Sequence, residues 1–64
     1  MDTTETHKMN DSELLLYLEM GDLSAAQGRN QEALDFYIKG LHKAKEQQDK
    51  ARIQQFSNLI YTYL

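Results

Sequence analysis

The sequence contains no cysteine, no proline and no tryptophan, and only three glycines. Without cysteine there is no disulfide, and two isolated histidines without thiolate partners do not make a structural zinc site. We therefore expect no metal or other cofactor. A chain of 64 residues buries a small share of its surface and usually needs help of this kind to fold stably. Self-association is the remaining way to obtain it.

Long apolar runs are also missing. The run at residues 14–18 lies between Glu13 and Glu19 and falls far short of the roughly 20 apolar residues that span a bilayer. Met1 is followed by Asp-Thr-Thr-Glu-Thr, which lacks the basic stretch and apolar core of a secretory signal. We therefore predict a soluble, cytoplasmic protein that does not associate with a membrane.

Basic residues are outnumbered, with seven lysines and arginines against ten acidic residues and a net charge of −3. Such a balance gives no general attraction for nucleic acid, so we expect no DNA or RNA partner. Leu, Ala, Glu, Gln and Lys are frequent and helix breakers are few, which predicts helices and no strands.

Apolar periodicity divides the chain into a polar tail at residues 1–9 and a helical domain at 10–64. The tail has no apolar period, and we expect it to be mobile. Within the domain we predict three helices, at about residues 11–27, 31–47 and 50–63. Asn10 followed by Glu13 has the spacing of a capping box at the first helix start.

Two segments separate the three predicted helices. Gly28 can take the left-handed conformation that ends a helix, and Asn30 can cap the next one. The segment 46–50 contains neither glycine nor proline, so one continuous helix over 31–64 is an alternative. We prefer a break with Asp49 as the cap of a third helix, because a single helix would leave its second half uncovered.

Each predicted helix has an apolar stripe at spacings of three and four residues. The stripe of the middle helix is wide enough to contact two neighbours. Together the three stripes predict an all-α fold, an antiparallel helical hairpin plus a third helix. Their members are Leu14, Tyr17, Leu18, Gly21 and Ala25, then Ala33, Leu34, Tyr37, Ile38, Leu41 and Ala44, and finally Ile53, Phe56, Leu59, Ile60, Tyr63 and Leu64.

The segment from Leu14 to about Gln47 resembles a tetratricopeptide repeat (TPR). Small and aromatic residues stand where that family places them, although Lys45 replaces its closing proline. The matching positions are Tyr17, Met20, Gly21, Gly28, Ala33, Tyr37 and Gly40. The resemblance implies that Gly21 and Ala33 face each other where the two helices cross, with Tyr37 in the core.

A partial second copy begins near Ile53, with Phe56 as its early aromatic residue. It departs from the family pattern at Ile60, which replaces the glycine of close helix contact. No second partner helix follows in the chain, so we expect the apolar residues of this copy to lack a partner within the molecule. The predicted association surface consists of Leu14, Phe56, Leu59, Ile60, Tyr63 and Leu64.

TPR arrays bind peptides on a concave surface formed by the first helix of each repeat. The matching positions here are Leu15, Leu18, Glu19, Asp22 and Ala25. An alternative is that these leucines join a dimer core, because one repeat has little concavity. Leu18 and Asp22 stand where carboxylate-binding members of the family carry lysine and asparagine, which disfavours capture of an acidic C-terminal peptide.

No active site is evident. His7 lies in the predicted tail and His42 lies among lysines, so neither has a nearby carboxylate and nucleophile. The basic residues at positions 39–52 are typical of a solvated helix end. Phe36 would join an interaction patch if it were exposed near Gly40.

These features predict a protein-interaction module, an adaptor or regulatory subunit rather than an enzyme, that binds a protein or peptide and forms a homodimer through open apolar helix faces. The alternative is a small chaperone or regulatory subunit that folds only in a complex with a different protein.

Overall fold

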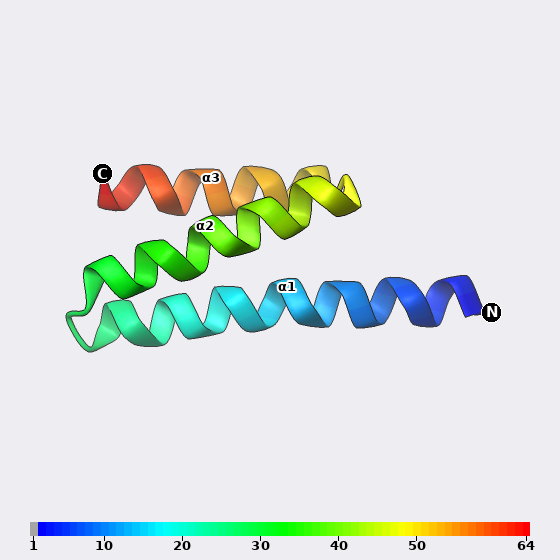
Figure 1. Cartoon of the computed structure of the whole chain (residues 1–64), viewed down its shortest axis with the longest axis horizontal. Helices are drawn as coiled ribbons and strands as arrows, with labels where there is room; N and C mark the ends of the chain where they lie inside the picture. Colours follow the sequence, from blue (N-terminus) through cyan, green and yellow to red (C-terminus); the bar gives the residue numbers. More distant parts are fainter. Residues whose placement is uncertain (1) are drawn as a thin grey trace.

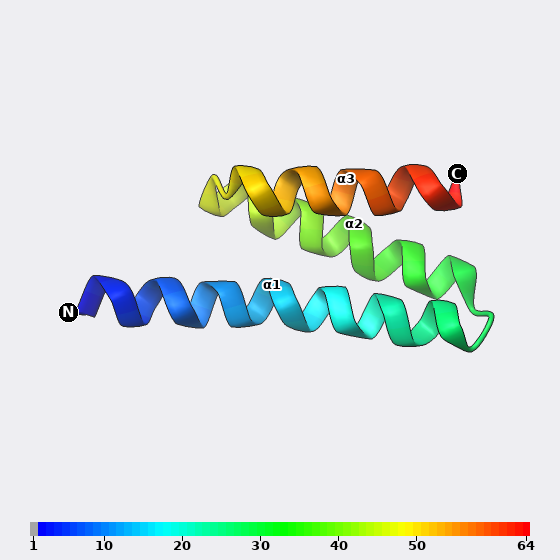
Figure 2. The same ribbon diagram turned by 180° about the vertical axis from the view of Figure 1, so that it is seen from behind.

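The chain forms three α-helices in the part described by the computed structural model, which covers the backbone of residues 2–64 and the side chains of residues 12–64. They are α1 (Asp2–Ala26), α2 (Asn30–Gln47) and α3 (Lys50–Tyr63). Helix α2 lies between the other two and packs against both, in alternating directions (Figure 1). The view from behind shows the same order (Figure 2). The predicted helical hairpin plus third helix is confirmed.

Helix α1 begins at Asp2, earlier than the start predicted near residue 11. The first eleven residues contain neither glycine nor proline, so no breaker stops the helix there. Residue 1 and the side chains of residues 2–11 lie outside the described part of the structure. The predicted mobility of residues 1–9 stays a prediction. The capping box predicted at Asn10 is wrong as a helix start, because the backbone of α1 already runs through residue 10.

The turn between α1 and α2 closes on Gly28, whose φ of 81° is in the left-handed region, as predicted. The amide of Gly28 donates to the carbonyl of Ala25 at 3.0 Å, and that of Arg29 donates to Ser24 at 2.9 Å. These two bonds satisfy carbonyls at the end of α1. The prediction that Asn30 caps α2 is wrong, because Arg29 occupies the cap position and no side chain accepts from the helix start.

A second turn separates α2 from α3 and excludes the alternative of one continuous helix. Gln48 adopts φ 56° and ψ 37°, and the amide of Asp49 donates to the carbonyl of Ala44 at 3.0 Å. The Asp49 carboxylate then accepts from the amide of Arg52 at 3.2 Å. Asp49 therefore caps α3, as the sequence predicted.

Gln48 has a side chain where the backbone favours glycine, since the left-handed conformation costs other residues roughly 1–2 kcal/mol. We expect Gln48→Gly to raise the free energy of unfolding by about 1 kcal/mol. The matched variant Gln47→Gly should lower it by about the same amount, because Gln47 is the last residue of α2. Urea unfolding followed by circular dichroism measures the change in both variants. A loss of stability in Gln48→Gly would contradict the left-handed conformation of residue 48.

The core lies along both sides of α2. Its buried apolar residues are Leu14, Leu18, Ala33, Tyr37, Ala44 and Phe56. Two helical glycines make room for aromatic rings, since a Cβ at position 21 would lie 2.8 Å from Cδ1 of Tyr37 and one at position 40 would lie 3.0 Å from Cδ1 of Phe56. The ring of Tyr37 thus lies against Gly21, and Ala33, which the sequence predicted opposite Gly21, is buried in the same core. Each interface is built from one ring packed on one glycine.

Candidate protein-interaction surfaces

Tyr37 of α2 contacts residues of both α1 and α3. Its hydroxyl donates a hydrogen bond to the carboxylate of Asp22 on α1, and its ring stacks on Tyr63 of α3 with the centroids 5.9 Å apart and the planes at 28°. Burial and the Asp22 carboxylate raise the pKa of the Tyr37 hydroxyl above its ordinary value, so it stays a donor. The contacts confirm Tyr37 as a core residue and fix both Asp22 and Tyr63.

The predicted peptide-binding residues of α1 do not form one open surface. Leu18 is buried and Ala25 is half-buried against the core. Asp22 is exposed, but its carboxylate accepts from Tyr37. Leu15 and Glu19 remain exposed, and no ion pair joins Glu19 to another described residue. These two side chains are the part of the predicted set that is free to meet a peptide.

The predicted association surface is divided between the core and the surface. Leu14 and Phe56 are fully buried within the chain. The expectation that Phe56 lacks a partner in its own chain is wrong, because Gly40 of α2 receives its ring. Three further members, Leu59, Ile60 and Tyr63, are half-buried against the core. Leu64 remains, with 84% of its surface exposed.

A groove opens between α2 and α3 at the C-terminal half of α3. It has a volume of about 210 Å³, and we call it the α2–α3 groove. Tyr61 and Leu64 border it with 78% and 84% of their surfaces exposed. Residues 53–64 carry no charged side chain, so this part of α3 contributes only neutral side chains to the groove. The lining residues are Leu41, Ser57, Ile60, Tyr61 and Leu64.

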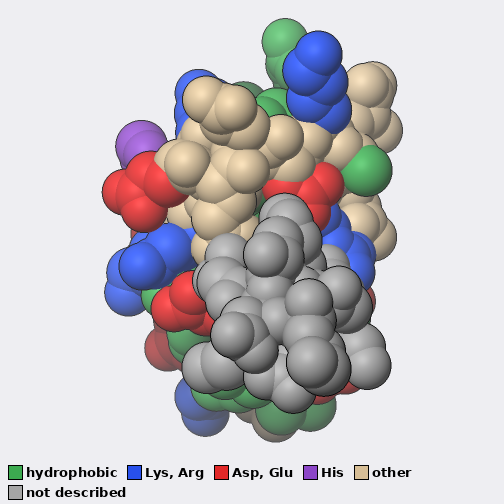
Figure 3. All heavy atoms as spheres, turned by 90° about the vertical axis from the view of Figure 1, so that its right-hand side faces the viewer, with side chains coloured by type: hydrophobic (Ala, Val, Ile, Leu, Met, Phe, Trp, Pro, Cys, Tyr) green, Lys and Arg blue, Asp and Glu red, His purple; other side chains and the backbone are tan. Residues whose placement is uncertain are grey.

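Helix α1 exposes a second set of apolar side chains outside the face that carries Leu14 and Leu18. Leu16, Met20 and Leu23, which we call the outer stripe, are 58%, 41% and 57% exposed. Their spacings of four and three residues place them on one face of the helix. In the end-on view, hydrophobic side chains are visible at the lower edge, over α1 (Figure 3). Leu16 and Leu23 are not among the predicted site residues, because apolar residues on opposite faces of α1 obscure each other's periodicity.

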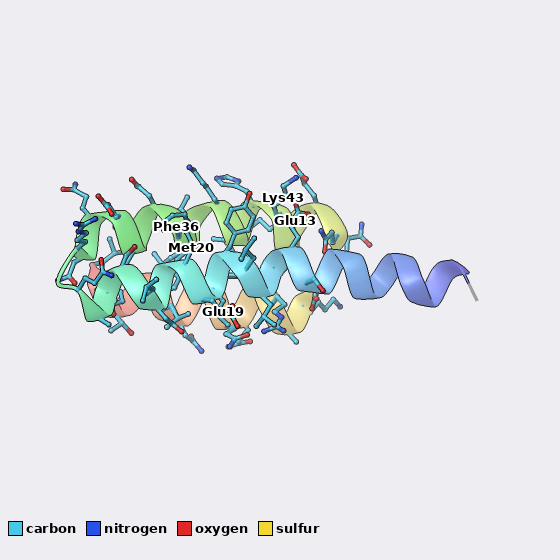
Figure 4. All side chains as sticks on the ribbon, turned by 90° about the horizontal axis from the view of Figure 1, so that it is seen from below. Glu13, Glu19, Met20, Phe36 and Lys43 are labelled. Atoms are coloured by element: carbon cyan, nitrogen blue, oxygen red, sulfur yellow. The ribbon has the colours of Figure 1, made fainter. Side chains whose placement is uncertain are left out.

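The edge where α1 meets α2 combines apolar and charged groups. Met20 and Phe36 point to the same edge, and Glu13 and Lys43 lie beside them, whereas Glu19 points to the opposite side of α1 (Figure 4). The Lys43 ammonium lies 3.8 Å from the Glu13 carboxylate. Phe36 is half-buried and borders a hollow of about 160 Å³ together with charged side chains. Phe36 therefore leaves part of its side chain exposed at the edge to which Met20 also points.

Among the side chains of residues 12–64, no three histidine, aspartate or glutamate residues lie close enough together to hold a metal ion. None of the helices, as far as they are described, combines the length and the apolar character needed to cross a membrane.

Comparison of the chain with models of known protein families, with curated proteins and with solved structures finds no match.

Proposed function

We propose that this chain is a helical protein-interaction module that binds polypeptide, rather than an enzyme, and that it self-associates with a homodimer as its smallest assembly. The observation that carries the proposal is the outer stripe. Leu14 and Leu18 anchor one face of α1 in the core, while Leu16 and Leu23 leave more than half of their surfaces in water on another face. A helix with apolar residues on opposite sides is typical of one placed between two neighbours.

Covering the outer stripe provides a driving force for association. Leu16, Met20 and Leu23 are 58%, 41% and 57% exposed, so covering the part still in water contributes about half of the roughly 1.5–3 kcal/mol for full burial of each side chain. The three together supply part of the free energy that a dimer requires. The rest has to come from neighbouring surfaces, because association also costs translational, rotational and side-chain freedom. The exposed part of Phe36 and the α2–α3 groove are apolar surfaces suited to this contribution.

The resemblance to tetratricopeptide repeats supports the same function. Repeats of this type bury their apolar faces by stacking on their neighbours. Helices α1 and α3 each pack a side of α2 through a glycine and an aromatic ring, as repeated elements would. By this reasoning the protein is a TPR-like adaptor or regulatory subunit in which no further helix covers the outer stripe of α1.

Size-exclusion chromatography with light scattering tests self-association. We expect the mass of the wild-type chain to exceed that of its 7.5 kDa monomer at micromolar concentration. Leu16→Glu with Leu23→Glu should shift the mass to that of a folded monomer, because charged groups resist burial. The control Gln31→Glu with Ala51→Glu adds the same two charges at exposed positions of α2 and α3 and should associate like the wild type.

A wild-type chain that is monomeric and fully helical at 100 micromolar would refute self-association. The alternative, a subunit that folds only with a different protein, has another signature. In that case circular dichroism of the isolated chain would show low helicity that does not rise with concentration.

A further inference from the structure

We infer that copies of this chain associate head to tail, with the outer stripe of one copy docked into the α2–α3 groove of the next. The inference rests on the proposed self-association and specifies its interface. The occupant of the groove is therefore helix α1 of a second copy. The two surfaces complement each other in shape, since one is a row of protruding side chains and the other is a hollow of about 210 Å³ with an apolar lining.

Charge supports this pairing. Residues 12–28, which carry the outer stripe, include no lysine or arginine, and Glu19 borders the stripe on the side away from Met20. Lys45 follows Leu41 by four residues and so continues the groove side of α2. Lys50 precedes Ser57 by seven residues and continues the groove side of α3. Both lysines are exposed beside the turn that joins α2 to α3.

The orientation of the docked helix follows from these charges. Glu19 precedes Leu23 by about one turn, so a helix with Glu19 near the two lysines carries Leu23 toward the uncharged end of the groove. That end contains Tyr61 and Leu64, the most exposed large apolar side chains among the described residues. In this one position of α1, Leu23 makes apolar contacts in the groove while Glu19 lies near the two lysines.

A two-fold contact between the outer stripes of two copies is less favourable. It would bring Glu19 of each copy beside the same acidic face of the other, without a basic residue of α1 between 12 and 28 to balance them. Like charges placed across an interface disfavour binding. A two-fold contact between two grooves would likewise oppose Lys45 and Lys50 to their own copies.

Head-to-tail contact has a consequence that a two-fold contact does not share. Two copies joined in this way use one stripe and one groove and leave the other stripe and groove open. Further copies can then add, until a ring closes or the concentration limits growth. The average mass should therefore continue to rise with concentration beyond the dimer.

Complementation of two variants tests the geometry in the full chain. The stripe variant carries Leu16→Glu and Leu23→Glu, and the groove variant carries Tyr61→Glu and Leu64→Glu, so both add two charges at exposed positions. We expect each variant to be monomeric alone at micromolar concentration. Their mixture should give a one-to-one complex that does not grow further, because the groove of the first and the stripe of the second are intact. Native mass spectrometry of one labelled and one unlabelled variant measures this.

Other outcomes overturn the inference. A groove variant that still forms dimers shows that stripes pair with stripes, and a stripe variant that still forms dimers shows that grooves pair with grooves. Two monomeric variants whose mixture stays monomeric also refute head-to-tail contact. A monomeric wild type refutes the proposed self-association itself. The experiment therefore distinguishes a failure of self-association from a failure of the head-to-tail geometry.

Charge reversal provides a test that does not depend on the leucines. Glu19→Lys and Lys45→Glu both alter exposed positions, and each should weaken association roughly two- to fivefold. The chain carrying both changes should recover wild-type affinity at low salt, because the reversed charges again face each other. A double variant that is weaker than either single one would contradict the proposed pairing of α1 with the groove.

Discussion

Phe56→Ala is expected to remove a large part of the free energy of unfolding at 25 °C. The side chain is fully buried and fills the space over Gly40, so truncation leaves a cavity between α2 and α3. Removing a buried phenylalanine costs about 3–5 kcal/mol. A domain of this size has a stability of roughly 3–10 kcal/mol at about 0.05–0.15 kcal/mol per residue, so the change removes a large part of it. Urea unfolding followed by circular dichroism measures the loss.

The control is Tyr61→Ala, which removes an aromatic ring from the same helix at a position that is 78% exposed. Its unfolding free energy should fall by no more than about 0.5 kcal/mol when measured on dilute, monomeric protein. The pair also separates two roles for Phe56. A Phe56→Ala chain that remains as stable as the wild type and only associates less would return Phe56 to the association surface and contradict its place in the core.

Local signals in the sequence were sufficient for the order and ends of α2 and α3. The left-handed position at Gly28 and the cap at Asp49 depend on interactions within a few residues, and both are present in the structure. The break at Gln48 carried no glycine signal, and it was predicted from the Asp49 cap and from the uncovered second half that a single helix would have. The start of α1 was placed too late because a polar segment without breakers can still be helical.

Contacts between helices were harder to predict, because they depend on side-chain directions that spacing alone does not give. The sequence identified Gly21 as a site of close approach and placed Tyr37 in the core, but spacing alone did not show that the ring of Tyr37 lies directly against Gly21. Phe56 was predicted on an open surface because its expected partner was a further helix, whereas Gly40 within α2 already provides the space for its ring.

The sequence pattern did not predict the outer stripe, for a related reason. A helix that is apolar on one face is read from its periodicity, but α1 has apolar residues on opposite faces, and their periodic signals cancel. Leu16 therefore resembled an exception to the stripe of Leu14 and Leu18. Only the position of α2 shows which face is covered, and it leaves Leu16 and Leu23 exposed.

Gly21→Val is expected to lower the free energy of unfolding by about 2–3 kcal/mol, since overpacking of a well-packed core costs about 1–3 kcal/mol and valine adds two methyl groups beyond Cβ. The three atoms nearest to a Cβ at this position all belong to the ring of Tyr37. That ring cannot yield easily, because its hydroxyl is bonded to Asp22 and its face is stacked on Tyr63. Chemical denaturation of the monomer gives the change in stability.

Two comparisons separate this steric effect from helix propensity. Ala26→Val introduces the same side chain at an exposed position of α1 and should cost less than about 0.7 kcal/mol. Tyr37→Leu removes the ring, and in that background the cost of Gly21→Val should shrink by at least about 1 kcal/mol, because contacting residues are energetically coupled. An equal cost in both backgrounds would show that position 21 is not limited by Tyr37, and the packing of α1 on α2 would then need another explanation.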